Sequence, residues 1–231
     1  MEGVRFPGES EAYRRARNEL LQAELELRRK VEDVAALRRK LPLGGEVQQD
    51  YEFEEGSADL ADTKTVRKVR LSELFEPGQD TLVLYSYMYG PKMKEPCPMC
   101  TSFLDGLDGN LPHIRRQVSF ALAARSPLAR IRELARGRGW RHHRLLSAEK
   151  NSFARDYFGE SVEEKQNPML NVFVKRGGKV HHFWGTESLY AKTGDDMDSR
   201  HIDQMWPLWH VLDLTPQGRG GRWYPAIDYA K

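Results

Sequence analysis

The only two cysteines of this chain, Cys97 and Cys100, lie three residues apart in the segment KMKEPCPMCTSF. A C-x-x-C pair has three common uses: it supplies two ligands to a zinc ion, it exchanges disulfides, or it places two small side chains in a core. Each use requires different features in the rest of the chain. The residues around the pair and the histidines are therefore the evidence that separates them.

A structural zinc ion takes four protein ligands, so the cysteine pair would be half of a site. The sequence has no second C-x-x-C, and the other ligands would come from His142-His143 and His181-His182. Both histidine pairs fall in expected strands, where neighbouring side chains point to opposite faces. Each pair therefore offers at most one ligand in a given direction. This spacing matches no zinc-finger pattern, but a site with one histidine from each pair stays an alternative.

Prolines surround the first cysteine. Pro96 and Pro98 bracket Cys97, and Gly90-Pro91 come shortly before it, which is typical of a turn that enters a helix and not of a helix interior. At a helix N-terminus, unpaired backbone N–H groups and the helix dipole favour a thiolate and lower the pKa of the thiol. Cys100 is then close enough to attack a mixed disulfide. We therefore predict a redox pair in which Cys97 is the nucleophile.

Strand and helix patterns alternate around the cysteines. Runs of β-branched and aromatic residues predict strands that begin at Thr81, Val118 and His143. Ser126 and Pro127 are expected as the cap and first residue of a helix, and a short helix is expected around residues 152–158. Strands that alternate with helices predict a parallel sheet covered by helices.

The C-terminal part of the chain departs from this alternation. MLNVFVK and KVHHFWG, joined by Arg176-Gly177-Gly178, predict a hairpin with a tight turn, which would add an antiparallel strand and make the sheet mixed. A last helix is expected over residues 199–210. The aromatic residues of this region are expected to pack in the core, and the tail after them to close over the domain. They include Trp184, Tyr190, Trp206 and Trp209.

A long charged helix is predicted from about Ser10 to Lys40, ended by Pro42. Its apolar side chains recur every seven residues, which predicts either packing on its own domain or a coiled-coil contact with a second copy. The row consists of Tyr13, Leu20, Leu27, Val34 and Leu41. We divide the chain into this helix (1–45), a connecting segment or hairpin (46–65), and a domain with a C-terminal tail (66–231).

Composition excludes several functions. A net charge of +2 in 231 residues gives no electrostatic case for nucleic acid. No stretch approaches the roughly 20 apolar residues that cross a bilayer, and no secretory signal is visible. We expect a cytoplasmic protein without nucleic-acid or membrane partners. In a reducing cytosol a close cysteine pair is more often catalytic or metal-binding than structural.

Several separated segments resemble the DUF899 family of thioredoxin-like proteins, described as predicted dithiol-disulfide oxidoreductases. They are LSELF with LVLYSYMYG, CPMCTSFLDG, ARSPLARI, GRGWRHHRLLSAEKNSFARDYFG, VFVKRGGKVHHFW and LDLTPQGRGGRWYP. The resemblance implies an α/β fold, a thioredoxin-like three-layer sandwich with a mixed central sheet. It further implies that Cys97 and Cys100 are the redox-active thiol pair of the family. It also implies a cis-proline at Pro168, which with Asn167 and Pro98 would line a substrate groove.

One segment, HRLLSAEKNSFARDYFG, resembles the insertion of peroxiredoxins, yet their Pro-x-x-x-Thr/Ser-x-x-Cys motif is absent. Counted back from Cys100, Met93 and Cys97 stand at the proline and hydroxyl positions; counted back from Cys97, Gly90 and Lys94 do. A peroxide pocket of that type is therefore not expected. A weak thiol peroxidase stays an alternative, as does a non-catalytic binding protein on the same fold.

The expected function is a thiol-disulfide oxidoreductase. Cys97 would attack a disulfide-containing protein, or a small thiol-reactive electrophile, and Cys100 would resolve the intermediate. An external reductant would then recycle the pair. No bound cofactor is required, because the two cysteines carry the electrons. A homodimer through the N-terminal helix is a further expectation.

Overall fold

The computed structural model describes residues 4–189, 191, 205–218 and 223–229. It divides into two compact units, Met1–Pro42 and Leu43–Lys231, which are described separately. Among the described residues, no helix combines the length and the apolar character that a membrane crossing requires.

The first unit is built on one long helix, α1 (Glu11–Arg39, 29 residues). The Ser10 hydroxyl accepts a hydrogen bond from the Tyr13 backbone N–H at 3.1 Å, which satisfies one of the N–H groups that a helix start leaves free. Both ends of α1 agree with the prediction. Side chains of its apolar row, such as Leu20 and Leu27, are more than half exposed.

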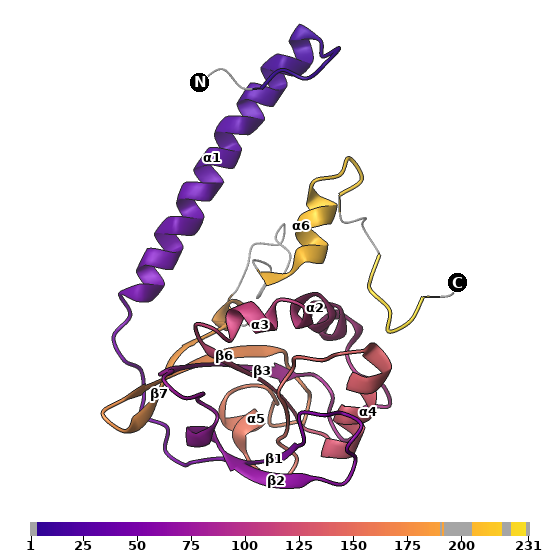
Figure 1. Ribbon diagram of the computed structural model, residues 1–231. Coiled ribbons are helices and arrows are strands. Elements are labelled where there is room, and N and C mark those ends of the chain that lie inside the picture. Colours follow the sequence, from indigo (N-terminus) through magenta and orange to yellow (C-terminus); the bar gives the residue numbers. More distant parts are fainter. Residues whose placement is uncertain (1–3, 190, 192–204, 219–222, 230–231) are drawn as a thin grey trace. The chain divides into compact units, whose positions relative to one another are not determined.

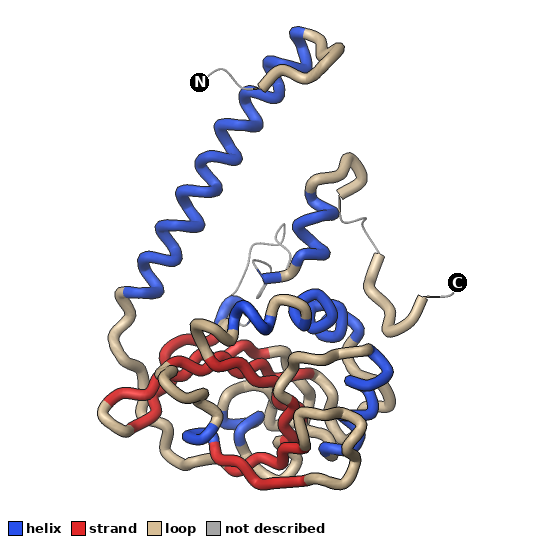
Figure 2. Tube along the Cα trace, in the orientation of Figure 1, coloured by secondary structure: helices blue, strands red, loops and turns tan. Residues whose placement is uncertain are grey.

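The second unit is built on one seven-stranded sheet with the order β2-β1-β5-β4-β3-β6-β7 (Figures 1 and 2). Strands β3, β4 and β5 are parallel, and β6 runs antiparallel to both β3 and β7. The strands are β1 (Glu52–Gly56), β2 (Val66–Arg70), β3 (Thr81–Tyr87), β4 (Ser119–Ala124), β5 (Leu145–Ser147), β6 (Met169–Arg176) and β7 (Lys179–Gly185).

Short helices lie between and after these strands, in the order β3-α2-α3-β4-α4-β5-α5-β6-β7-α6. They are α2 (Pro98–Asp108), α3 (Leu111–Ile114), α4 (Leu128–Arg138), α5 (Phe153–Asp156) and α6 (Pro207–Asp213), with 3-10 turns η1 (Leu71–Glu73) and η2 (Glu187–Leu189). This order of connections and strands confirms the expected α/β class, a thioredoxin-like sandwich with a mixed central sheet and a long N-terminal helix.

Each face of the sheet carries its own core. On β3, Tyr85 and Tyr87 point to one side and Leu82 and Leu84 to the other, because successive strand residues face opposite ways. Helices α2, α4 and α6 contribute buried side chains to the tyrosine side, whereas α5 and η1 cover the leucine side (Figure 1). Both cysteines belong to the core on the tyrosine side.

The predicted hairpin is confirmed. Arg176 pairs with Lys179, so the turn consists of Gly177 and Gly178 alone. Their φ angles are 57° and 78°. A two-residue turn of this kind needs positive φ at both positions, which glycine adopts without steric cost.

The predicted cap of α4 is wrong by one residue. Pro127 is the N-cap, and the first helical residue is Leu128. The Ser126 hydroxyl is buried and donates to the Tyr89 carbonyl at 2.6 Å instead of capping the helix. A buried hydroxyl must find a partner, and here the chain that leads from β3 supplies it.

Other boundaries also differ from expectation. Residues 46–65, expected as a hairpin or a connection, contribute β1, which pairs antiparallel with β2. His142-His143 precede β5 and are not in it, because the Asp108 carboxylate accepts their backbone N–H groups at 2.9 and 3.3 Å. Helix α6 extends beyond the predicted end at residue 210, while residues 199–204 lie outside the described part of the chain.

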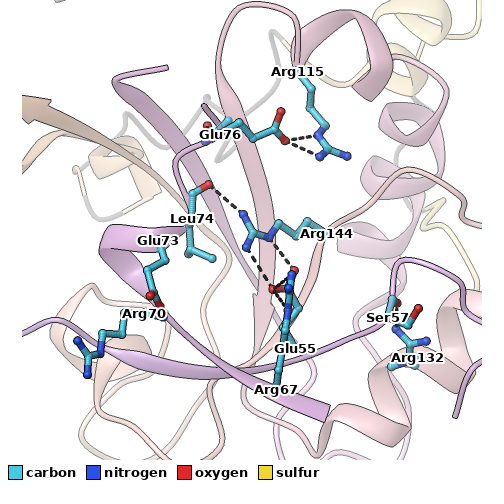
Figure 3. A network of polar contacts seen from close by, with 11 residues as sticks. Glu55, Ser57, Arg67, Arg70, Glu73, Leu74, Glu76, Arg115, Arg132 and Arg144 are labelled. Atoms are coloured by element: carbon cyan, nitrogen blue, oxygen red, sulfur yellow. Dashed lines mark hydrogen bonds and ion pairs between the residues drawn. The ribbon is translucent and has the colours of Figure 1, made fainter. Parts of the chain in front are cut away.

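A buried carboxylate joins the β1–β2 pair to the rest of the sheet (Figure 3). Glu55 of β1 is almost fully buried, and its oxygens accept hydrogen bonds from Arg67 at 2.9 Å and from Arg144 at 2.7 Å. Nearby, Arg132 of α4 donates to the Ser57 carbonyl at 2.5 Å. Because every charge in this network has partners, the cost of burying it is offset.

Candidate active site

The loop after β3 brings Cys97 to the start of α2. The Cys97 backbone N–H donates to the Met88 carbonyl at 3.0 Å, which holds the residue just past the end of β3. Cys97 is the N-cap of α2 and Pro98 its first helical residue, so the pair lies at a helix start as predicted. The Thr101 hydroxyl donates to the Cys97 carbonyl at 2.9 Å and lies 2.6 Å from the Tyr87 hydroxyl. The first turn is therefore anchored to β3.

The Cys97 sulfur accepts a hydrogen bond from the Cys100 backbone N–H at 3.4 Å. Cys97 is also the more exposed residue of the pair, at 9% against 2% for Cys100. A hydrogen bond from the Cys100 thiol, supported by the backbone N–H groups of Cys100 and Met99, outweighs burial and lowers the pKa of Cys97 to about 6. At neutral pH Cys97 is thus mostly a thiolate.

Cys100 has the opposite environment. Burial raises the pKa of its thiol well above the usual range, and the hydrogen bond to the Cys97 sulfur and the charge there raise it further. The two cysteines titrate as a pair in which Cys97 carries the charge and Cys100 keeps the proton. Such an arrangement can support nucleophilic attack by the outer sulfur and later attack by the inner one.

A tyrosine hydroxyl approaches each sulfur. Tyr85 of β3 is fully buried beside Cys100, and within the described chain its hydroxyl has no partner at ordinary hydrogen-bond geometry. Tyr224 belongs to the C-terminal tail, and its hydroxyl lies near the Cys97 sulfur and helps to lower the pKa of that thiol. Sequence reasoning missed both residues. The only available signal was the RWYP segment near the C-terminus, which contains Tyr224 but shows no link to the cysteines.

The tryptophans of the C-terminal region pack in the core, as expected. Trp206 and Trp209 are buried in the same core as the cysteines, and Trp184 lies half-buried against it. The Trp206 ring meets that of Phe103 of α2 edge-on, with centroids 5.8 Å apart. Tyr190 lies outside the described residues. Helix α6 therefore packs its indole rings against the helix that carries the cysteines.

The expected cis-proline is not present. The Asn167-Pro168 bond is trans, as are all described peptide bonds. The trans form of an X–Pro bond is preferred by about 0.5–1 kcal/mol, and here the Asn167 backbone N–H reaches the Gly159 carbonyl at 2.9 Å. The segment nevertheless lies near the cysteine loop, by which we mean the residues between β3 and Cys97. Gly90 of this loop is so close to Gln166 that an added Cβ would come within 2.8 Å of the Gln166 side chain.

The histidines do not gather around the cysteines as zinc ligands. His143 Nε2 lies 3.0 Å from the Leu104 carbonyl, and His182 Nε2 lies 2.9 Å from the Asn171 side-chain oxygen. In the described part of the chain, no three His, Cys, Asp or Glu side chains are grouped so as to hold a metal ion.

A family model described as "Bacterial protein of unknown function (DUF899)" matches residues 4–229. The chain belongs to the DUF899 family. The match covers both compact units, so α1 and the C-terminal tail are parts of what this family shares. A comparison with curated proteins finds no match.

Solved structures similar to this DUF899 protein include thioredoxin peroxidase I of Plasmodium yoelii, at 19% identity and a TM-score of 0.46, covering 82% of this chain and 100% of that one. Plasmodium vivax 2-Cys peroxiredoxin has 16% identity and a TM-score of 0.46, covering 73% and 97%. The exposed lipoprotein thioredoxin Etrx1 of Streptococcus pneumoniae has 14% identity and a TM-score of 0.39, covering 68% and 99%.

Proposed function

We propose that this protein is a thiol-disulfide oxidoreductase with Cys97 as the attacking and Cys100 as the resolving cysteine. One observation supports the proposal: Cys97 is the N-cap of α2, where its sulfur accepts a hydrogen bond from the Cys100 backbone N–H. This environment lowers the pKa of Cys97 to about 6, whereas burial raises the pKa of Cys100. A thiolate is the reactive form in disulfide exchange, and a pKa near 6 leaves it abundant without making it a poor nucleophile.

In the first step, the Cys97 thiolate attacks one sulfur of a substrate disulfide, R–S–S–R′. A Cys97–S–S–R bond forms, the substrate S–S bond breaks, and R′–S⁻ leaves and takes a proton from solvent. The negative charge that had raised the Cys100 pKa disappears with this step. The resolving thiol therefore becomes easier to ionise at the moment when it is required.

In the second step, Cys100 attacks the Cys97 sulfur. A Cys97–Cys100 disulfide forms, the bond to R breaks, and the Cys100 proton ends on the departing thiol R–SH. Two electrons pass from the two cysteines to the substrate disulfide. An external thiol reductant then returns the pair to its reduced state, and no bound cofactor is needed.

We propose that the substrate binds beside Pro98 and the segment Asn167-Pro168. Pro98 follows the nucleophile directly, and the segment before β6 packs against the cysteine loop through Gln166. An ion pair between Lys92 and Glu164 joins the same two segments. We expect the substrate to be a disulfide-containing peptide or protein in extended form.

Acid-quenched mass spectrometry after mixing the reduced protein with oxidised glutathione tests the function. The wild type should lose the mass of two hydrogens, whereas Cys100→Ser should keep a glutathione adduct on Cys97. Cys97→Ser should form no adduct at neutral pH. If Cys97→Ser reacted as fast as the wild type, or if both thiols of the wild type were inert, the oxidoreductase reading would be lost in favour of a binding protein.

We also propose that α1 pairs with a second copy of the chain. Leu20 and Leu27 of its apolar row are more than half exposed, and rows of this spacing form coiled-coil seams. Analytical ultracentrifugation of the full chain and of a variant without residues 1–42 provides the test. The full chain should be a dimer and the shortened one a monomer; a shortened chain that stays dimeric would exclude α1 as the contact.

A further inference from the structure

The C-terminal tail, residues 223–229, is fixed on both sides of Tyr224. Before it, the Trp223 ring meets Trp209 of α6 edge-on, with centroids 6.1 Å apart. After it, the Ile227 carbonyl accepts a hydrogen bond from the Arg138 guanidinium at 2.5 Å. The chain on both sides of Tyr224 is therefore held by a contact with the rest of the domain.

The elements that make these two contacts, α6 and Arg138, are themselves bound to α2, the helix that begins at the cysteine pair. Arg138 of α4 also forms an ion pair with Asp105 of α2. Trp206, next to α6, donates from its ring N–H to the Ser102 hydroxyl of α2 at 3.5 Å. The tail, α6 and α2 thus form one connected assembly, and within it the Tyr224 hydroxyl lies near the Cys97 sulfur. Tyr224 is more than half exposed, but its partial burial and the nearby Cys97 charge raise the pKa of its hydroxyl, so it remains a hydrogen-bond donor when Cys97 is ionised.

The second tyrosine lies on the other side of the pair. Tyr85 is wholly buried between the sheet and α2, with its ring 5.1 Å from that of Phe103. Its hydroxyl has no partner at ordinary geometry among the described residues, and such buried orphans are costly. The group beside it is the Cys100 thiol, and a neutral thiol is a weak acceptor. A thiolate at the same place would be a strong one.

We propose that each sulfur has its own tyrosine donor: the Tyr224 hydroxyl stabilises the Cys97 thiolate before attack, and the Tyr85 hydroxyl stabilises the Cys100 thiolate as it forms during resolution. The proposal rests on the oxidoreductase function above and assigns two further catalytic residues to it. Neither tyrosine gives up its proton. Each only donates a hydrogen bond to the sulfur that carries charge in that step.

Two single variants separate the two roles. In Tyr224→Phe, loss of one hydrogen bond should raise the Cys97 pKa by about half to one unit. Iodoacetamide alkylation of Cys97, followed by mass spectrometry, should then be about two- to threefold slower at pH 5. At pH 8 it should be about two- to threefold faster, because a more basic thiolate is a better nucleophile. A purely structural role would not produce this crossover.

In Tyr85→Phe, the pH profile of Cys97 alkylation should stay close to that of the wild type. Closure of the Cys97 glutathione adduct to the internal disulfide should instead be about five- to tenfold slower, because Cys100 loses a donor to its forming charge. Each variant thus serves as the control for the other. Tyr13→Phe removes a half-exposed hydroxyl from α1, in the other compact unit, and should match the wild type in both assays.

Thermal unfolding of each variant checks that the fold is retained. If the Tyr224→Phe profile overlaid the wild-type one, or if Tyr85→Phe closed its adduct at the wild-type rate, the assignment of that tyrosine would be overturned while the oxidoreductase function stood. If wild-type Cys97 itself titrated near the ordinary thiol value of about 8.5, the proposed function would fail first.

Discussion

The ionised Cys97 should make the stability of the reduced protein depend on pH in a defined window. Its folded-state pKa is lowered from 9.0 to about 6, so the unfolded chain binds a proton that the folded chain does not between these values. Stability should therefore rise with pH through this window and be lost as pH falls toward 6, with a limiting slope of about 1.4 kcal/mol per pH unit. From pH 7 to 8.5 the gain should be roughly 1.5–2 kcal/mol.

Other groups act outside this interval. Burial lowers the pKa of His143 and His182, so their effect falls below about pH 6.5, where the unfolded histidines take up protons. The raised pKa of Cys100 lowers the stability of the folded protein only when the pH rises past the ordinary pKa of a thiol, because the unfolded Cys100 then ionises while the folded one keeps its proton. Urea unfolding of the reduced protein at intervals between pH 7 and 8.5 therefore isolates Cys97.

Cys97→Ser provides the comparison, because serine is close to cysteine in size and replaces the thiol with a hydroxyl that does not titrate. The variant should show little gain over the same interval, and the difference between the two curves is the measured contribution of the thiolate. Parallel curves for wild type and Cys97→Ser would mean that the folded protein keeps Cys97 protonated. The electrostatic reasoning behind the site would then be refuted, whatever the activity.

Three further variants probe the supports of the site. Thr101→Val keeps the shape of the side chain but leaves the buried Tyr87 hydroxyl without its partner, which should lower the urea midpoint by the equivalent of about 1–3 kcal/mol. Arg138→Gln removes the tail anchor and should reproduce the alkylation crossover of Tyr224→Phe; an unchanged pH profile would show that the anchor is dispensable. Gly177→Ala places a side chain at a positive φ and should cost about 1–2 kcal/mol in thermal unfolding, with no effect on thiol reactivity.

The elements that carry the cysteines could be predicted because local chemistry determines them. Prolines on both sides of Cys97 mark a helix start, and Gly177-Gly178 between two apolar runs permit only a tight turn. Ser126 resembles a cap in sequence but satisfies a distant carbonyl, since a buried hydroxyl takes whichever partner the fold brings near it. Local pattern cannot show that choice.

The rest of the site depends on contacts between remote segments. The isomer of the Asn167-Pro168 bond follows from the chain that packs around it, and no neighbouring residue signals it. Tyr224 lies near Cys97 because Trp209 of α6 and Arg138 of α4 hold the chain on either side of it. In the sequence Tyr85 is an ordinary aromatic residue of a buried strand. Among the described residues its buried hydroxyl has no hydrogen-bond partner at ordinary geometry, and the sequence does not show this.

The short stretch after α1 has a consequence for how the sheet avoids edge-to-edge aggregation. The Val47 N–H donates to the Val180 carbonyl at 2.9 Å and the His182 N–H to the Gly45 carbonyl at 3.0 Å, so the stretch covers part of the outer edge of β7. The opposite edge strand, β2 (Val66–Arg70), carries Arg67, Lys68 and Arg70, and their like charges disfavour pairing with the same edge of another molecule. A truncation that ends at residue 42 keeps both protections, whereas one that continues past Gly45 would expose unpaired backbone and invite aggregation.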